Sequence, residues 1–270
     1  MSDAKTKLCC LIGNPVDHSL SPQMFNHGFQ CLKLNFAYVA CRVTDVQKAL
    51  EGIRALQIVG INVTIPHKVS VLKYVDRIDS QAREIGAANI IINKNGKLIA
   101  SNSDWIGAVR ALREKTTLRN KKIAVIGAGG AARAIIYGLK KNGADVSIWN
   151  RTIKGAQKLV KEFSLQKAYE LNNRMDFSTF DIIINATAIG MTPRVDLSPI
   201  PASAIFPHHI IFDIVYTPSE TKLLKMAKEK GATPIFGYKM LLYGGAASFE
   251  AFTGRKAPVV AMEKSLRNYD

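Results

Sequence analysis

The residues in this chain that are best suited to chemistry form a glycine-rich turn. Gly127, Gly129 and Ala132 match the spacing G-x-G-x-x-A, directly after an apolar run at 122–126 and directly before a helical pattern at 131–142. The first glycine permits a tight turn, the second lets the backbone approach a pyrophosphate, and the third position lets helix and strand pack closely. This context argues against an ordinary glycine-rich turn. It predicts a dinucleotide cofactor bound by Gly127, Ala128, Gly129, Gly130, Ala131 and Ala132.

The end of the next predicted strand indicates which dinucleotide is bound. An Asp or Glu at that place would bind the ribose 2′-hydroxyl of NAD. This chain has Asn150, Arg151 and Thr152 there, with Lys154 two residues further on. Because an arginine can donate paired hydrogen bonds to a phosphate, the sequence favours NADP over NAD. The alternative is that Arg151 merely ends a strand on a solvated surface.

A second set of polar residues lies in the N-terminal half. Ser19 and Ser21 stand at the start of a helical pattern, where hydroxyl groups and free N–H groups suit a carboxylate ligand. Lys68 follows a strand that ends on Pro66, and Asp104 precedes another helix. Taken singly, each has a plainer explanation, because Ser21 and Asp104 could be helix caps and Lys68 a solvated surface lysine.

The elements that must position these residues alternate between strands and helices. This alternation predicts an α/β fold built from parallel βαβ units. We expect strands at 8–12, 36–41, 58–65, 122–126, 145–149, 181–185 and 210–214, and a hairpin over 90–100. We expect helices at 22–32, 44–56, 68–74, 80–85, 104–114, 131–142, 220–230 and 240–252.

The change of pattern between 104 and 120 indicates a boundary between two domains. The apolar helix over 240–252 carries small residues for close packing, and we expect it to return to the first domain. The predicted domains are therefore a substrate-binding domain, 1–103 plus 240–270, and a dinucleotide-binding domain of the Rossmann type, 104–239.

Composition narrows the range of partners. Lys and Arg number 37 against 21 Asp and Glu, and the resulting net charge of +16 favours anionic ligands. Because the basic residues are dispersed and no aromatic residues are interleaved with them, we expect no nucleic-acid partner. No apolar run is long enough to span a membrane. Cys9, Cys10, Cys31 and Cys41 include no Cys-x-x-Cys pair, so we expect buried free thiols at Cys9 and Cys10, no metal site and a cytoplasmic location.

Several motifs occur in a fixed order along nearly the whole chain. They are Gly-Asn-Pro-x-x-His-Ser-x-Ser-Pro at 13–22, Asn-Val-Thr-x-Pro-x-Lys at 62–68, Gly-Ala-x-Asn at 86–89, Asn-x-Asp at 102–104, Gly-x-Gly-Gly-Ala-x-Arg at 127–133, Asn-Arg-Thr at 150–152 and Asn-Ala-Thr-x-x-Gly-Met at 185–191. The ordered set resembles the shikimate dehydrogenase family. The resemblance implies two α/β domains with the active site in the cleft between them. It also implies NADPH-dependent reduction of 3-dehydroshikimate to shikimate, a step in aromatic amino acid and chorismate biosynthesis.

The resemblance also implies a role for individual residues. Lys68 and Asp104 would form the catalytic pair that handles the proton. The substrate would be bound by Ser19, Ser21, Thr64, Asn89 and Tyr216. Besides the glycine-rich turn and the residues from Asn150 to Lys154, the cofactor would be bound by Asn185, Ala186, Thr187, Ile214, Gly237 and Met240.

The chain departs from the family pattern in places that leave alternatives open. Gly244 stands where the family usually has a glutamine that contacts the substrate, and Gly155 stands where a second arginine often follows Asn-Arg-Thr. A quinate/shikimate dehydrogenase with broader substrate or NAD use therefore remains open. A non-catalytic ligand sensor on the same scaffold is a further alternative, against which Lys68 and Asp104 argue. The sequence is compatible with a monomer or a homodimer, and the family implies no metal.

Overall fold

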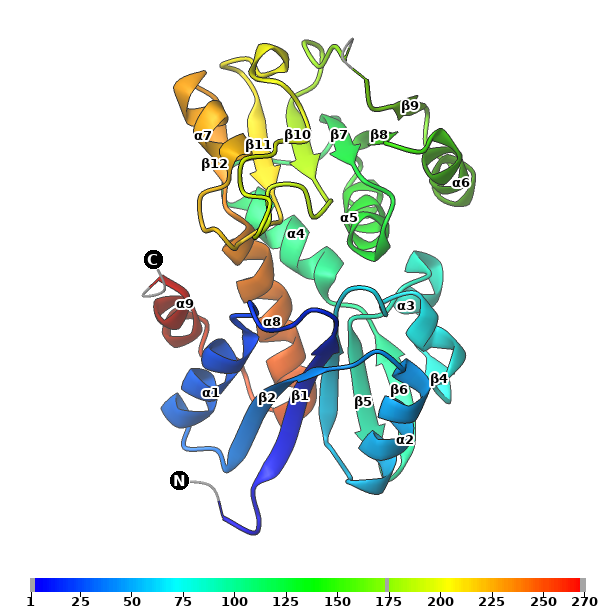
Figure 1. Cartoon of the computed structure of the whole chain (residues 1–270), viewed down its shortest axis with the longest axis vertical. Helices are drawn as coiled ribbons and strands as arrows, with labels where there is room; N and C mark the ends of the chain where they lie inside the picture. The colour runs from blue at the N-terminus through cyan, green and yellow to red at the C-terminus, as the bar shows by residue number, and fades with distance from the viewer. Residues whose placement is uncertain (1–2, 173–174, 268–270) are drawn as a thin grey trace. The chain divides into compact units, whose positions relative to one another are not determined.

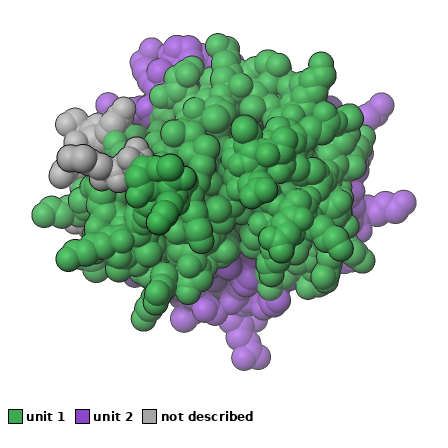
Figure 2. Space-filling model, turned by 90° about the horizontal axis from the view of Figure 1, so that it is seen from below, with its two compact units in different colours: residues 1–104, 241–270 green, residues 105–240 purple. Residues whose placement is uncertain are grey.

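The computed structural model describes residues 3–172 and 175–267, and the chain divides into two compact units (Figure 2). Unit 1 consists of Met1–Asp104 and Leu241–Asp270, and unit 2 of Trp105–Met240. The chain passes between the units at the start of α4 (Asp104–Arg113) and within α8 (Gly237–Thr253). Each unit contains its own six-stranded sheet, and each is described by itself below.

The sheet of unit 1 is mixed, with the strand order β2-β1-β3-β5-β6-β4. The strands are β1 (Lys7–Gly13), β2 (Phe36–Arg42), β3 (Gly60–Val63), β4 (Arg77–Ile78), β5 (Ile90–Lys94) and β6 (Lys97–Ser101). Strand β1 pairs in parallel with β2 and β3, whereas β5 pairs antiparallel with β3 and β6. The predicted hairpin is confirmed, and its two turn residues, Asn95 and Gly96, both have the positive φ that such a turn requires.

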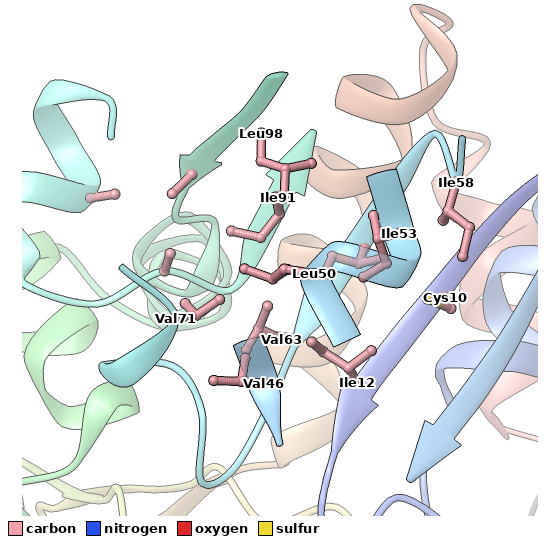
Figure 3. Packing of buried hydrophobic residues seen from close by; sticks show 14 residues of the cluster. Cys10, Ile12, Val46, Leu50, Ile53, Ile58, Val63, Val71, Ile91 and Leu98 are labelled. Atoms are coloured by element: carbon pink, nitrogen blue, oxygen red, sulfur yellow. The ribbon is translucent and has the colours of Figure 1, made fainter. Parts of the chain in front are cut away.

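Helices cover both faces of this sheet. They are α1 (Ser21–Cys31), α2 (Val46–Ala55), α3 (Ser80–Ile85), α9 (Val259–Arg267) and the C-terminal part of α8. Leu50 and Ile53 of α2 belong to one buried cluster with Cys10, Ile12 and Ile91 of the strands (Figure 3).

The opposite face of this sheet is covered by α1 and α8. Successive side chains of a strand point to opposite faces, so Cys9 of β1 faces away from α2. Tyr38 is paired in register with Cys9 and stacks on Phe25 of α1, with Phe249 of α8 nearby. Helix α1 also packs against α9 (Figure 1).

One predicted helix of unit 1 is wrong in type. Over 68–74 the chain forms only a short 3₁₀ turn, Ser70–Lys73. The β-branched Val69 and Val71 disfavour an α-helix there. Cys9 and Cys10 are buried free thiols, as predicted. Burial raises the pKa of the Cys9 thiol to about 12, so this thiol is not a nucleophile at neutral pH.

The sheet of unit 2 is parallel throughout, with the strand order β12-β11-β10-β7-β8-β9. The strands are β7 (Lys122–Ile126), β8 (Asp145–Asn150), β9 (Ala168–Glu170), β10 (Ile182–Asn185), β11 (Ile210–Asp213) and β12 (Thr233–Ile235). Read from the β9 edge, this is the strand order of the Rossmann fold, and the strand order reverses between β7 and β10. Ligands of such sheets bind at the carboxyl ends of the strands beside this point. The predicted α/β class is confirmed.

Helices connect the strands of unit 2. They are α5 (Gly130–Lys141), α6 (Ile153–Phe163), α7 (Lys222–Glu229) and the 3₁₀ turn Ala202–Ala204, whereas α4 precedes the first strand, β7 (Figure 1). Leu223 and Leu224 of α7 are buried in one cluster with Ile183 of β10 and Ile211 of β11. Across residues 3–172 and 175–267, no helix combines the length and apolar character that crossing a membrane demands.

Candidate active site

Two oppositely charged side chains from distant parts of unit 1 form an ion pair. Lys68 Nζ donates a hydrogen bond to Asp104 Oδ2 at 2.5 Å. Their side chains are only 16% and 12% exposed, which excludes the solvated surface lysine as an interpretation of Lys68. Asp104 is the first residue of α4, and its carboxylate is directed to Lys68. An ion pair at this depth is held far more rigidly than one in open solvent.

Asn89 holds the other oxygen of Asp104. Its Nδ2 donates to Asp104 Oδ1 at 2.8 Å and to Ser103 Oγ at 3.1 Å. Its Oδ1 accepts from the backbone N–H of Ser103 at 2.7 Å. Asn89 is buried and lies just before β5. It therefore anchors the Asp104 carboxylate to the sheet of unit 1. The contact with substrate that the family resemblance implies for Asn89 stays a prediction.

A polar network that the sequence did not indicate lies behind this pair. Ser248 of α8 lies with its Oγ 3.3 Å from Ser103 Oγ and accepts a hydrogen bond from Asn62 Nδ2 at 2.8 Å. Asn102 Oδ1 accepts from the backbone N–H of Asp104 at 2.9 Å. Ser103, Asn102 and Ser248 are buried. Two features of the sequence could have indicated this network. One is a lone serine, Ser248, in an apolar helix, and the other is the pair of polar residues Asn102 and Ser103 directly before Asp104.

The predicted substrate-binding hydroxyls of unit 1 lie at one edge of its sheet. Ser19 and Ser21 follow β1 and Thr64 follows β3, and these neighbouring strands are parallel, so their carboxyl ends meet at the same edge. The interpretation of Ser21 as a helix cap is wrong, because the N-cap of α1 is Leu20. Instead, Ser19 Oγ accepts the backbone N–H of Ser21 at 3.2 Å. Helix α1 begins one residue early, which places Ser21 inside its first turn.

The glycine-rich turn of unit 2 has the geometry that a pyrophosphate requires. Gly127 has φ +115°, and its N–H donates to the carbonyl oxygen of Trp149 in the neighbouring strand β8 at 2.7 Å. Gly129 is the N-cap of α5, and apart from Gly129 and its two chain neighbours no described heavy atom lies within 4 Å of where a Cβ on it would stand. Ala132 is fully buried. Open space therefore lies beside the first N–H groups of α5, and these residues fit a dinucleotide phosphate.

The predicted phosphate-binding side chains follow β8, which is the parallel neighbour of β7. Arg151, Thr152 and Lys154 are exposed at the start of α6, so their polar groups are accessible to a ligand. Asn150 Nδ2 donates to the carbonyl oxygen of Thr152 at 2.9 Å and holds this turn in place. A Cβ on Gly155 would lie 2.9 Å from Asn150 Nδ2, so the side chain of Asn150 occupies the space there.

Four of the remaining predicted cofactor residues follow or end β10 and β11, and Gly237 of α8 approaches the end of β11. The backbone N–H of Ile214 donates to the carbonyl oxygen of Asn185 at 3.1 Å. A Cβ on Gly237 would lie 2.4 Å from the carbonyl oxygen of Val215 and 2.6 Å from that of Ile214, so only glycine allows this approach. Met240 is buried in the first turn of α8.

Ala186 and Thr187 lie against the glycine-rich turn itself. Tyr216 is half-buried on the loop after β11. The structure thus brings the unit 2 residues of the predicted site to one edge of its sheet, whereas their contacts with cofactor and substrate stay predictions. In the described ranges, no three His, Cys, Asp or Glu side chains are grouped to bind a metal ion.

Comparison with known proteins identifies the family. Three family models match the chain: the shikimate dehydrogenase substrate binding domain at 11–91, shikimate / quinate 5-dehydrogenase at 110–214, and the shikimate 5'-dehydrogenase C-terminal domain at 237–267. A shikimate dehydrogenase (NADP(+)) from Methanococcus maripaludis is 44% identical over 277 residues, which cover 99% of each chain.

Solved structures agree with this match. A crystal structure of a shikimate dehydrogenase in complex with NADP+ has a TM-score of 0.94 at 41% identity, covering 99% of this chain and 97% of that one. A shikimate 5-dehydrogenase from Thermus thermophilus, in complex with NADP(H) and shikimate, has a TM-score of 0.89 at 32% identity, covering 97% and 99%. The resemblance drawn from the ordered motifs is confirmed, and the chain belongs to the shikimate dehydrogenase family.

Proposed function

We propose that this chain is an NADP-dependent dehydrogenase that interconverts 3-dehydroshikimate and shikimate, in the pathway to chorismate and the aromatic amino acids. The observation that carries the proposal is the buried ion pair of Lys68 and Asp104, at the sheet edge that also bears Ser19, Ser21 and Thr64. A non-catalytic sensor would have little use for a proton donor held in this way. The four free cysteines support a reducing compartment, the cytoplasm.

Unit 2 binds the cofactor in this proposal. The backbone N–H groups from Gly127 to Ala132 hold the pyrophosphate at the start of α5. The guanidinium of Arg151, with Asn150, Thr152 and Lys154 beside it, binds the phosphate on the adenosine ribose. The nicotinamide side is lined by residues at the ends of β10 and β11, Asn185, Ala186, Thr187 and Ile214, together with Gly237 and Met240 of α8. NADPH, when bound, supplies the hydride that reduces the carbonyl carbon.

Unit 1 binds the substrate. Ser19 and Ser21 donate their hydroxyl hydrogens to the substrate carboxylate near the start of α1, where free N–H groups favour an anion. Thr64, Asn89 and Asp104 bind ring hydroxyls. The family resemblance adds Tyr216, on the loop after β11, to the substrate-binding residues. These positions give each polar group of shikimate a partner of matching hydrogen-bond character.

Lys68 handles the proton. When the carbonyl carbon accepts hydride, its oxygen becomes an alkoxide, and the Lys68 ammonium stabilises that charge and donates a proton to it. In the reverse direction the neutral amine accepts the hydroxyl proton. Asp104 fixes Nζ in place, and Asn89 in turn fixes Asp104, so the donor is in position before the substrate arrives.

The experiment is an initial-rate assay of nicotinamide absorbance with purified protein. Shikimate and quinate are each tested with NADP and with NAD, and 3-dehydroshikimate with NADPH. We expect rapid turnover with shikimate and NADP. Comparable rates with quinate or NAD would move the protein to a broader specificity. Gly244 would explain the use of quinate, because a Cβ there would lie 3.4 Å from the carbonyl oxygen of Ser103 and glycine leaves that space free. Gly155, where a second arginine often stands, would explain the use of NAD. Absence of turnover with every pair would contradict the proposal.

A further inference from the structure

A buried carboxylate that neither the motifs nor the family resemblance assigned connects three segments of unit 2. Asp213, the last residue of β11, is fully buried. Its Oδ1 accepts hydrogen bonds from Asn185 Nδ2 at 2.9 Å and from the backbone N–H of Val215 at 3.0 Å. Its Oδ2 accepts from Thr221 Oγ1 at 2.7 Å. One side chain therefore connects the end of β10, the loop after β11 and the start of α7.

Asp213 determines the orientation of the Asn185 amide. An ionised carboxylate only accepts hydrogen bonds, so the NH₂ group of Asn185 must face it. The Asn185 Oδ1 then points the other way, where it accepts from the backbone N–H of Thr187 at 3.1 Å and from Thr187 Oγ1 at 2.7 Å. Thr187 Oγ1 in turn accepts from the backbone N–H of Ile189 at 3.1 Å. The loop after β10 is thus held in one conformation.

This loop packs directly on the glycine-rich turn. A Cβ on Gly127 would lie 2.9 Å from Thr187 Cγ2 and 3.0 Å from the carbonyl oxygen of Ala186. The two segments therefore touch without room for a side chain, and a shift of Thr187 would move Gly127 with it. Hydrogen bonds and contacts form a continuous path from Asp213 through Asn185 and Thr187 to Gly127.

The burial of Asp213 carries an energetic cost that a structural role alone does not require. Burial raises the pKa of its carboxyl to about 6, against the opposing effect of the three hydrogen bonds it accepts. The group is therefore ionised at neutral pH in a site that disfavours the charge. A neutral residue of the same shape would cost less free energy to bury. It would, however, present an N–H donor to Asn185 or Thr221, and both of these groups donate to Asp213.

We propose that Asp213 is a positioning residue for the cofactor site, which sets the geometry of the glycine-rich turn by orienting Asn185 and Thr187. The inference rests on the proposed function, because it takes the ligand of that turn to be a nicotinamide dinucleotide. Asp213 acts through its neighbours, and its removal should weaken cofactor binding while leaving the substrate side in unit 1 unchanged.

The test compares Asp213→Asn with Asp181→Asn. Asp181 directly precedes β10, at the opposite end from Asn185, and accepts hydrogen bonds from Lys121 Nζ at 2.9 Å and from the backbone N–H of Lys122 at 2.8 Å. The Kd for NADPH is measured by fluorescence titration without substrate, and the KM values for NADP and shikimate by initial rates. For Asp213→Asn we expect the Kd to rise about 10-fold or more, because a hydrogen-bonded buried charge is removed. The KM for shikimate should stay unchanged, and Asp181→Asn should alter neither constant.

Each other outcome has a definite meaning. If the wild-type protein binds NADPH and folded Asp213→Asn binds it with the same Kd, this inference is overturned and the proposed function is not. An equal loss of affinity for NADP and shikimate would overturn it too, because that is the result of a general structural role. Wild-type protein that fails to bind NADPH would overturn the proposed function as well.

A second pair of variants keeps the test decisive if Asp213→Asn does not fold. Thr221→Val removes one donor to Asp213 while keeping the size of the side chain, and Thr221→Ser keeps the hydroxyl. We expect Thr221→Val to weaken NADPH binding and Thr221→Ser to restore it. Equal Kd values for the two folded variants would contradict the inference.

Discussion

Lys68 Nζ and Asp104 Oδ2 lie 2.5 Å apart although the two residues are 36 positions apart in the sequence. Two adjacent residues directly before β5 hold both of them. The backbone N–H of Ala88 donates to the carbonyl oxygen of Lys68 at 2.8 Å, and Asn89 Nδ2 donates to Asp104 Oδ1 at 2.8 Å. The sheet of unit 1 thus anchors both partners of the ion pair, through the backbone of Lys68 and the carboxylate of Asp104.

Replacing the acidic partner should lower the rate more than it lowers binding. In Asp104→Asn the Lys68 ammonium loses the charge that fixes it, and we expect kcat for shikimate oxidation to fall about 100-fold. The matched control is Asp76→Asn, which removes a carboxylate of the same unit that pairs with Arg54 at 2.6 Å and is 43% exposed. The control should stay within about two-fold of wild type. A kcat for Asp104→Asn near that of the control would contradict the role given to Asp104.

Two glycine substitutions should separate cofactor binding from stability. A Cβ on Gly237 would lie 2.4 Å from the carbonyl oxygen of Val215, so Gly237→Ala should lower the free energy of unfolding by about 1–3 kcal/mol. A Cβ on Gly129 would meet no described atom within 4 Å, so Gly129→Ala should leave the melting temperature unchanged. Gly129→Ala should instead raise the Kd for NADPH about 10-fold, because its methyl group enters the space proposed for the pyrophosphate. Thermal unfolding and NADPH titration of both variants check this, and a destabilised Gly129→Ala with normal affinity would oppose it.

Arg151 should set the preference for NADP over NAD. Its side chain is exposed at the end of β8, and in Arg151→Ala the kcat/KM for NADP should fall about 10- to 100-fold through the loss of paired hydrogen bonds to a phosphate. The kcat/KM for NAD should hardly change, because NAD lacks that phosphate. Lys154→Ala is the matched control and should have a smaller effect, since an ammonium is a point charge. Equal losses with NADP and NAD would show that Arg151 does not bind the phosphate.

Asp213 should give stability a pH dependence of defined sign. Burial raises the pKa of this carboxyl from 3.8 to about 6, so the folded chain binds the proton more tightly than the unfolded chain. Its contribution to the free energy of unfolding is therefore fully present below about pH 4 and is lost as the pH rises through about 6, a change of about 3 kcal/mol. Urea unfolding of wild type and Asp213→Asn across this range isolates the effect. The stability of wild type minus that of the variant should fall as the pH rises, and a flat or rising difference would disagree with it.

Local signals in the sequence predicted the cofactor unit well. The turn at Gly127 lies between a buried strand and a helix, and both patterns are readable within a few residues. Strands β4, β9 and β12 were not predicted, because segments of two or three residues show no alternation. Helix α6 was also missed, although Ala156 and Leu159 are buried at helical spacing.

The candidate site was harder to predict from the residues alone. Nothing in the spacing of Lys68 and Asp104 indicates that they meet, and the pairing was expected only from the family resemblance. Ser248 and Asp213 went unassigned because each is a lone polar residue next to an apolar run. Only the folded chain shows that Ser248 lies near Ser103, and that three donors converge on Asp213.

The central claim is that Lys68 donates the proton to the reduced carbonyl oxygen. The most direct measurement is kcat for shikimate oxidation by Lys68→Met, a variant whose unbranched side chain ends one atom short of Nζ and carries neither its proton nor its charge. Circular dichroism and the Kd for NADPH serve to show that the variant is folded and binds cofactor. We predict a loss in kcat of about 100- to 10,000-fold with an unchanged Kd for NADPH. Near-normal turnover by this folded variant would contradict the account.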